Sequence, residues 1–132
     1  MTALHLGDSY NAVASVLSRY FDGLYNSDAR ALSEVFHPQA NYVCAVERDF
    51  VCRSMDEYLS IVAGRPSPAS RNEMRRDSIV SIEFAGPAIA VARVNCAIGS
   101  RYFTDALTLI REGGAWRIMS KVFHYEESGA AR

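Results

Sequence analysis

Asp105 is the residue with the clearest capacity for chemistry in this sequence. It interrupts a run of alternating apolar residues, 102–109, whose pattern and content of β-branched and aromatic types predict a β-strand. A carboxylate on the apolar face of a strand must be paired, hydrogen-bonded or neutralised. Asp105 is therefore predicted to be either an acid that holds an oxygen atom of a ligand, or a structural group that pairs with Lys121 or with a neighbouring strand.

Tyr20 and Cys44 are the next candidates. Tyr20 falls on the apolar face of a predicted helix, where a buried hydroxyl needs a partner, although an aromatic residue at this spacing is also typical of a core. Cys44 shares a strand face with Tyr42, and its thiol could be a nucleophile only if its pKa were lowered. No histidine lies nearby in the sequence, so the pattern favours a small buried hydrophobe at Cys44.

The direction of the Lys121 side chain depends on the turn at residues 113–114. A turn of three loop residues places Lys121 opposite Asp105, where an ion pair is natural. A turn of two residues directs it to the other face, because a one-residue shift reverses every side chain of a strand. Both alternatives remain open. In the preceding hairpin, a two-residue turn at 99–100 places Val94 opposite Asp105.

Basic residues gather around a predicted loop at 64–73, which contains two prolines. A solvated loop is the favoured interpretation, and the alternative is a pocket rim that attracts an anionic ligand. His124, at the end of a predicted strand, is interpreted as structural, with acid–base chemistry as the alternative. The basic residues of this region are Arg65, Arg71, Arg75 and Arg76.

Three helices must position these residues. The first is predicted at about 8–25, and the segment 26–28 breaks it and caps a short second helix that ends near Pro38. Ser54 and Glu57 fit a capping box for the third helix, which ends near residue 64. Alternation and turn residues predict strands at about 41–46, 50–52, 77–84, 88–98, 102–109 and 116–123.

Short turns join the last four strands, which makes them antiparallel neighbours. The order of elements predicts an α+β fold, in which a long, curved antiparallel sheet packs on three helices. A sheet that curls around the first helix forms a cone with an apolar pocket, and such pockets commonly bind small molecules. The predicted lining consists of Tyr20, Phe36, Tyr42, Cys44, Tyr58, Phe103, Asp105, Lys121 and Phe123.

Length and charge exclude several functions. A chain of 132 residues predicts a single domain over 1–132, with its core at about 8–126. The net charge of −1 provides no basic field for binding nucleic acid. No apolar run approaches the ~20 residues that span a bilayer. The N-terminus lacks the pattern of a signal peptide, so a cytoplasmic protein without membrane association is expected.

The three cysteines, Cys44, Cys52 and Cys96, are an odd number in a chain without a signal peptide, which argues against a disulfide framework. The spacing of cysteines and histidines does not match a zinc site. We therefore expect neither a metal nor a cofactor.

The order of elements, together with the segments 103–107, 116–118 and 121–123, resembles the nuclear transport factor 2-like superfamily, which includes ketosteroid isomerase and SnoaL-type polyketide cyclases. The likeness covers about residues 8–126 and is closest to a bacterial branch named "putative lumazine-binding". It implies the cone fold. It also implies a homodimer through the outer face of the sheet, toward which Arg93, Asn95, Thr104 and Thr108 are predicted to point.

Ketosteroid isomerase provides a comparison at the level of residues. Its oxyanion hole consists of a helix tyrosine, which matches Tyr20, and a protonated strand aspartate, which matches Asp105. The aspartate that acts as its base falls on Cys44. Two positions therefore agree, and the missing base argues against isomerisation by proton shuttling.

Two functions follow as hypotheses. The first is binding of a small apolar or aromatic molecule, with or without a cofactor-free isomerase, cyclase or dehydratase reaction in which Asp105 and Tyr20 stabilise an oxyanion. The second is a non-catalytic dimerisation or partner-binding module. A wide cavity with polar groups favours the first, and a cavity filled by Tyr42, Phe123 and Met119 favours the second.

Overall fold

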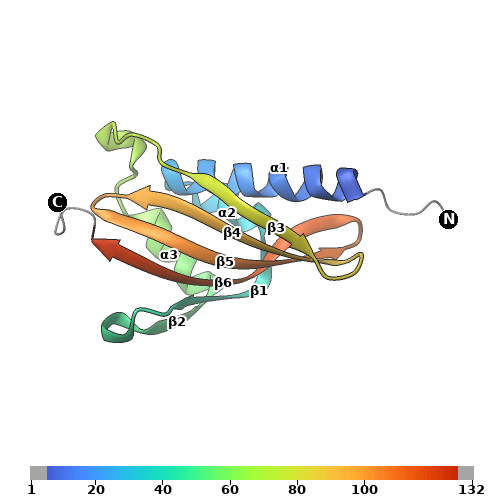
Figure 1. The fold of residues 1–132 in the computed structure, drawn as a ribbon. Coiled ribbons are helices and arrows are strands. Elements are labelled where there is room, and N and C mark those ends of the chain that lie inside the picture. Colours follow the sequence, from blue (N-terminus) through green and yellow to red (C-terminus); the bar gives the residue numbers. More distant parts are fainter. Residues whose placement is uncertain (1–5, 128–132) are drawn as a thin grey trace.

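The computed structural model of the chain describes residues 6–127 (Figure 1). The helices are α1 (Leu6–Tyr25), α2 (Ala29–Val35) and α3 (Met55–Gly64), with short 3-10 helices η1 (Glu47–Asp49) and η2 (Ala69–Arg71). The strands are β1 (Phe36–Cys44), β2 (Val51–Ser54), β3 (Ser78–Phe84), β4 (Ile89–Ile98), β5 (Arg101–Glu112) and β6 (Ala115–Glu127). None of the described helices is long and apolar enough to cross a membrane.

Side-chain caps fix where two of the helices begin. The carboxylate of Asp28 accepts a hydrogen bond from the backbone N–H of Ala31 and caps α2. At α3, the Ser54 hydroxyl accepts from the backbone N–H of Glu57, whose carboxylate accepts from the backbone N–H of Ser54. Both caps confirm the sequence prediction.

The six strands form one sheet in the order β2-β1-β6-β5-β4-β3. The sheet is curved, and the three helices lie on one side of it (Figure 1). This arrangement confirms the predicted α+β fold. One detail differs, because β1 and β6 are parallel whereas all other neighbours are antiparallel. Four strands separate β1 from β6 in the chain, so no tight turn constrains the direction of this pair.

Strand β1 begins earlier than predicted. Phe36 already pairs with Ile118 of β6, directly after the end of α2. The register then shifts between Phe36 and Asn41, a stretch that contains Pro38. Proline has no backbone N–H to donate to a neighbouring strand, so regular pairing is interrupted at this point. The irregular pairing allows the strand to continue past it.

The β5–β6 hairpin decides the direction of Lys121. Its turn has two residues, Gly113 and Gly114, both with positive φ, between the paired Glu112 and Ala115. That turn alone would direct Lys121 outward. However, Thr108 pairs with Ser120 and Leu109 with Ile118, so Met119 is an extra residue in β6. This bulge reverses the phase of the strand. Lys121 therefore points inward, the direction that the three-residue alternative predicted, but it lies opposite Leu107 and not opposite Asp105.

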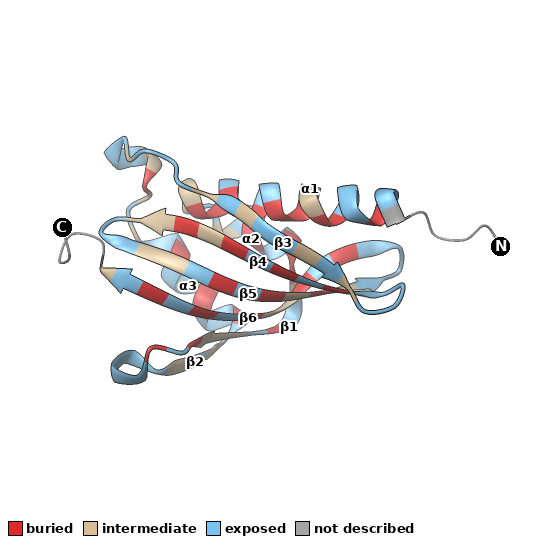
Figure 2. Ribbon diagram, viewed as in Figure 1, coloured by how far each residue is buried: buried red, intermediate tan, exposed pale blue. Residues whose placement is uncertain are grey.

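The core lies between the helices and the inner face of the sheet. Buried and exposed residues alternate along the central strands (Figure 2). On β5, Asp105, Leu107 and Leu109 are fully buried, whereas Thr104 and Ala106 are exposed. The two-residue turn predicted at 99–100 is also present, since Val94 pairs with Asp105 as expected. Asp105 is thus placed on the inner face by the register of both hairpins.

Candidate functional site

Tyr20 and Asp105 meet in the interior. The Tyr20 hydroxyl on α1 donates a hydrogen bond of 2.5 Å to Oδ2 of Asp105 on β5. Both side chains are fully buried, so the apolar face of α1 carries Tyr20 onto the inner face of the sheet. The partner that each polar group was predicted to need is therefore the other one. Neither group is reached by solvent in this arrangement.

Lys121 lies in an aromatic cage. Its Nζ atom is 5.1–5.4 Å from the ring centroids of Tyr20, Tyr42, Tyr58 and Phe123. An ammonium group within about 6 Å of an aromatic ring is attracted by the negative face of the ring. No salt bridge joins Lys121 to Asp105 among the described residues. Direct pairing with Lys121 is therefore not what satisfies Asp105.

Burial and neighbouring charges shift the pKa values of Asp105 and Lys121 in opposite directions. Burial raises the pKa of the Asp105 carboxyl, although the Lys121 ammonium and the hydrogen bond from Tyr20 oppose the rise. Burial lowers the pKa of Lys121, but nearby groups, above all Tyr58 and Asp105, raise it by more, so its pKa lies above the ordinary value. Burial and the Asp105 charge raise the pKa of Tyr20 well above its ordinary value. At neutral pH the cage thus holds an ammonium and Tyr20 is a neutral phenol.

Aromatic rings pack against one another in the interior that contains Asp105. Tyr42 stacks on Tyr58 with centroids 4.5 Å apart and meets the edge of Phe123 at 4.9 Å. The ring centroid of Phe36 lies 5.8 Å from that of Tyr20 and 5.8 Å from that of Tyr58, with an edge-to-face arrangement in both pairs. The deep part of the predicted pocket is therefore packed with side chains. Two polar atoms in it, Oδ1 of Asp105 and the hydroxyl of Tyr58, have no hydrogen-bonding partner among the described residues.

A cavity of about 300 Å³ opens next to this cage, between the ends of β1, β5 and β6, strand β2 and the residue that follows α3. We call it the mouth cavity. Tyr42 and Phe123 belong both to its wall and to the cage, so an occupant would lie next to the caged ammonium. Its lining consists of Tyr42, Cys44, Asp49, Val51, Arg53, Arg65, Arg101, Phe103, Phe123 and Tyr125.

The nine residues predicted to line one pocket thus lie at two levels. Four of them line the mouth cavity, and the other five lie in the closed interior. The first group is Tyr42, Cys44, Phe103 and Phe123, and the second is Tyr20, Phe36, Tyr58, Asp105 and Lys121.

Arginines contribute most of the charge in the mouth cavity. Arg101 pairs with Glu127 through an Nε–Oε1 contact of 3.1 Å and lies over the Tyr125 ring. Arg53 and Arg65 form no salt bridge among the described residues. Neither Arg53 nor Arg101 was predicted to be a site residue. A signal was present for Arg101, which is in phase with Phe103 and Asp105 along β5.

Three of the four arginines near the loop at 64–73 lie away from the cavity. Arg71 pairs with Glu73, Arg75 pairs with Asp22 and Asp77, and Arg76 lies over the ring of Tyr102. Of these four arginines, only Arg65 lines the mouth cavity. The alternative of basic residues at a pocket rim therefore concerns Arg65, because the other three arginines make their contacts outside the cavity.

The family model described as "Putative lumazine-binding" matches residues 8–124. The chain belongs to this family. No curated protein matches it. An NTF2-like protein of unknown function from Shewanella baltica has a TM-score of 0.83 at 23% identity, covering 94% of this chain and 98% of that one. One from Silicibacter pomeroyi has a TM-score of 0.79 at 22% identity, covering 93% and 100%.

A ketosteroid isomerase-like protein from Erwinia carotovora atroseptica has a TM-score of 0.68 at 9% identity, covering 87% of this chain and 94% of that one. At such identities the likeness shows the fold alone. The predicted superfamily and branch are confirmed, and this member of the lumazine-binding family shares the NTF2-like architecture.

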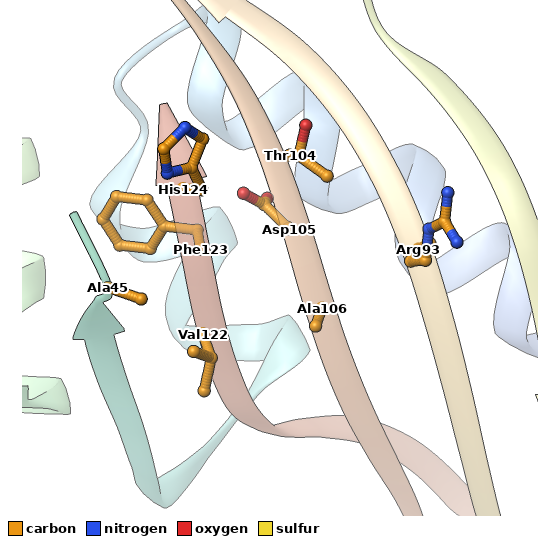
Figure 3. Close-up of a pocket in the computed structure, with 8 residues that line it drawn as sticks. All are labelled: Ala45, Arg93, Thr104, Asp105, Ala106, Val122, Phe123 and His124. Atoms are coloured by element: carbon orange, nitrogen blue, oxygen red, sulfur yellow. The ribbon is translucent and has the colours of Figure 1, made fainter. Parts of the chain in front are cut away.

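The outer face of the sheet in this family member carries a second hollow, of about 240 Å³ (Figure 3). Arg93 and Thr104 lie there, as predicted for outward residues. His124 is exposed beside them, and Val122 is 38% exposed. The hollow is lined by Ala45, Arg93, Thr104, Asp105, Ala106, Val122, Phe123 and His124. It lies on the opposite side of the sheet from the helices.

The cysteines are free thiols. Cys44 and Cys96 are buried, whereas Cys52 is exposed. Burial and the Asp105 charge raise the pKa of Cys96 to about 12, which keeps it protonated at neutral pH. No group of three or more histidine, cysteine or acidic side chains suited to a metal ion occurs within residues 6–127.

Proposed function

We propose that this protein binds a small molecule with a flat apolar or aromatic body in the mouth cavity. The observation that carries the proposal is the wall of this cavity, in which four rings surround a space of about 300 Å³. This volume falls at the lower end of the range for small-molecule sites, about 300–1,000 Å³. The rings are those of Tyr42, Phe103, Phe123 and Tyr125.

The supports of these rings favour a preformed site. The ring centroid of Phe103 lies 5.6 Å from that of Phe123 and 5.8 Å from that of Tyr125. The Tyr125 hydroxyl donates a hydrogen bond of 2.6 Å to Oδ2 of Asp49. Tyr42 is stacked on the buried Tyr58. A wall held on both sides loses little freedom when a ligand binds, so more of the contact energy remains as affinity.

Binding of a neutral bicyclic probe, 2-naphthamide, tests the proposal. We expect titration of isotope-labelled protein to shift NMR resonances of residues around the mouth cavity, with sub-millimolar affinity. Phe103→Leu should weaken binding about fivefold, because an aromatic contact is lost. The matched control is Phe84→Leu, since Phe84 packs on Trp116 and does not line the cavity. Resonances that stay unshifted, or equal losses in both variants, would contradict the proposal.

A cofactor-free isomerase, cyclase or dehydratase reaction is the second candidate. The observation that favours it is the pair of buried polar atoms without partners, Asp105 Oδ1 and the Tyr58 hydroxyl, close to the Lys121 cage. A substrate could form hydrogen bonds with these atoms only if the side chains that bury them moved. The Tyr20 hydroxyl already donates to Asp105, so the oxyanion hole is not assembled in this arrangement.

The ketone 2-tetralone in heavy water distinguishes the two candidates. If Asp105 and its neighbours stabilise an enolate, the protein should accelerate exchange of the protons next to the carbonyl, and Asp105→Asn should abolish the acceleration. If the protein only binds ligands, exchange should proceed at the rate of the buffer alone.

A further inference from the structure

The charge of the mouth cavity differs from that of the whole chain. The chain has a net charge of −1, yet within residues 6–127 the lining of this cavity contains three arginines and one carboxylate, that of Asp49. Asp49 also accepts the hydrogen bond from Tyr125. A concave site lined mainly by one sign of charge concentrates ions of the opposite sign. The side chains that line the cavity therefore carry a net positive formal charge.

Arg65 gives the strongest indication that the cavity binds a ligand. It follows α3 as its C-cap residue, where a cation interacts favourably with the helix dipole. The dipole gives no hydrogen bond to the side chain, however, and the Nε atom of Arg65 is buried without a partner among the described residues. A buried charged donor without an acceptor is destabilising, because it has lost its hydrogen bonds to water and gained none from the protein. An anionic ligand in the cavity could supply the missing acceptor.

Arg53, which forms no salt bridge among the described residues, can also bind an anion. The nearby carboxylate of Glu57 is engaged in the capping box of α3, where it accepts the backbone N–H of Ser54 at 2.9 Å. Arg101 differs, because Glu127 and the Tyr125 ring hold it in place. The cavity thus combines one fixed arginine with two that have no carboxylate partner.

We infer that the ligand of the mouth cavity is a planar aromatic carboxylate. Its ring would lie against Tyr42 and Phe103, and its carboxylate would accept hydrogen bonds from Arg53 and Arg65. The planar guanidinium group matches a carboxylate with two parallel hydrogen bonds, which makes arginine suited to this recognition. This inference rests on the proposed function and adds the chemical class of the ligand to it.

The test compares two probes of the same shape, 2-naphthoate and 2-naphthamide, by calorimetry or NMR titration. We expect 2-naphthoate to bind at least about tenfold more tightly, since charged hydrogen bonds are about twice as strong as neutral ones. Raising the salt concentration should weaken only the carboxylate. If neither probe binds, the proposed function fails; if both bind equally, only the inference about charge fails.

Arg65→Gln should reduce the preference for the carboxylate to about threefold or less while 2-naphthamide binds as before. Arg71→Gln is the matched control, because it removes the same charge from the same loop but Arg71 pairs with Glu73 outside the cavity. Equal effects of the two variants would overturn the assignment, since they would indicate only a general field. If Arg65→Gln does not fold, as judged by circular dichroism, Arg53→Gln provides the same comparison.

Discussion

The hydroxyl of Tyr20 donates a hydrogen bond of 2.5 Å to Oδ2 of Asp105, which joins α1 to β5 across 85 residues of sequence. Because a phenol has one proton, Tyr20 keeps no donor for a ligand while this bond exists. The pair is therefore a link between helix and sheet as the structure stands. A role in chemistry on a ligand requires the bond to open.

Tyr20→Phe should lower the free energy of unfolding by about 2 kcal/mol, because Oδ2 of Asp105 loses its buried donor. Tyr10→Phe is the matched control, since Tyr10 lies on the same helix and is 46% exposed. Urea unfolding followed by circular dichroism measures both variants. Equal stability of Tyr20→Phe and the wild type would show that the hydrogen bond contributes nothing to the fold.

Asp105 should make stability depend on pH with a defined sign. Its pKa is raised in the folded state from the ordinary value of 3.8, so the folded protein holds the proton at pH values where the unfolded chain has lost it. Stability from this group is therefore fully present below about pH 4 and falls as the pH rises to the folded pKa. The unfolding free energy of the wild type minus that of Asp105→Asn should decrease across this window and level off above it.

A difference that increased with pH would show that the folded state prefers the carboxylate. The carboxyl carbon resonance of Asp105 gives the folded pKa independently, and its midpoint should coincide with the end of the decrease.

Lys121→Met removes the ammonium from the cage and leaves Asp105 without a nearby positive charge. We expect a loss of about 3 kcal/mol at neutral pH, the usual cost of leaving a buried charge uncompensated. The double variant Lys121→Met with Asp105→Asn should lose less than the sum of the single variants. Additive losses in this cycle, measured by urea unfolding, would show that the two groups do not interact.

The outer hollow supports the proposal of a homodimer through the outer face of the sheet. Its Val122 side chain is partly exposed between Ala106 and Ala45, so an arginine there would place a charge in the interface. Val122→Arg should convert the dimer to a monomer in analytical ultracentrifugation. Ile61→Arg, on α3 with 41% exposure, should leave the dimer intact. A monomeric wild type would refute this proposal.

The fold could be predicted largely because local signals agree with the tertiary structure. The capping box at Ser54, the cap at Asp28 and the glycine turn at 113–114 each act within a few residues. They fix where helices begin and how the hairpins pair, whereas the parallel pairing of β1 with β6 has no such local signal. Tyr20 and Asp105 were each predicted to need a partner if buried, but their hydrogen bond to each other depends on the packing of α1 on the sheet.

The site was harder to predict, because the space left open in it depends on side-chain rotamers and on the β-bulge at Met119. The stacking of Tyr42 on Tyr58 closes the interior, and no periodic pattern encodes a rotamer. The arginines of the mouth cavity come from β2, β5 and the end of α3, which meet only in the folded chain. Pattern analysis also assumes strict alternation, which the extra residue Met119 breaks.

That extra residue has a consequence for transferring residue roles between relatives. Before it, the inward positions of β6 are Trp116 and Ile118, and after it they are Lys121, Phe123 and Tyr125. An ungapped alignment with a relative whose strand lacks the bulge would match its interior residues to Val122 and His124, which are exposed here. A gap at position 119 therefore decides whether an interior residue of the relative is matched to the buried Lys121 or to its neighbour Ser120.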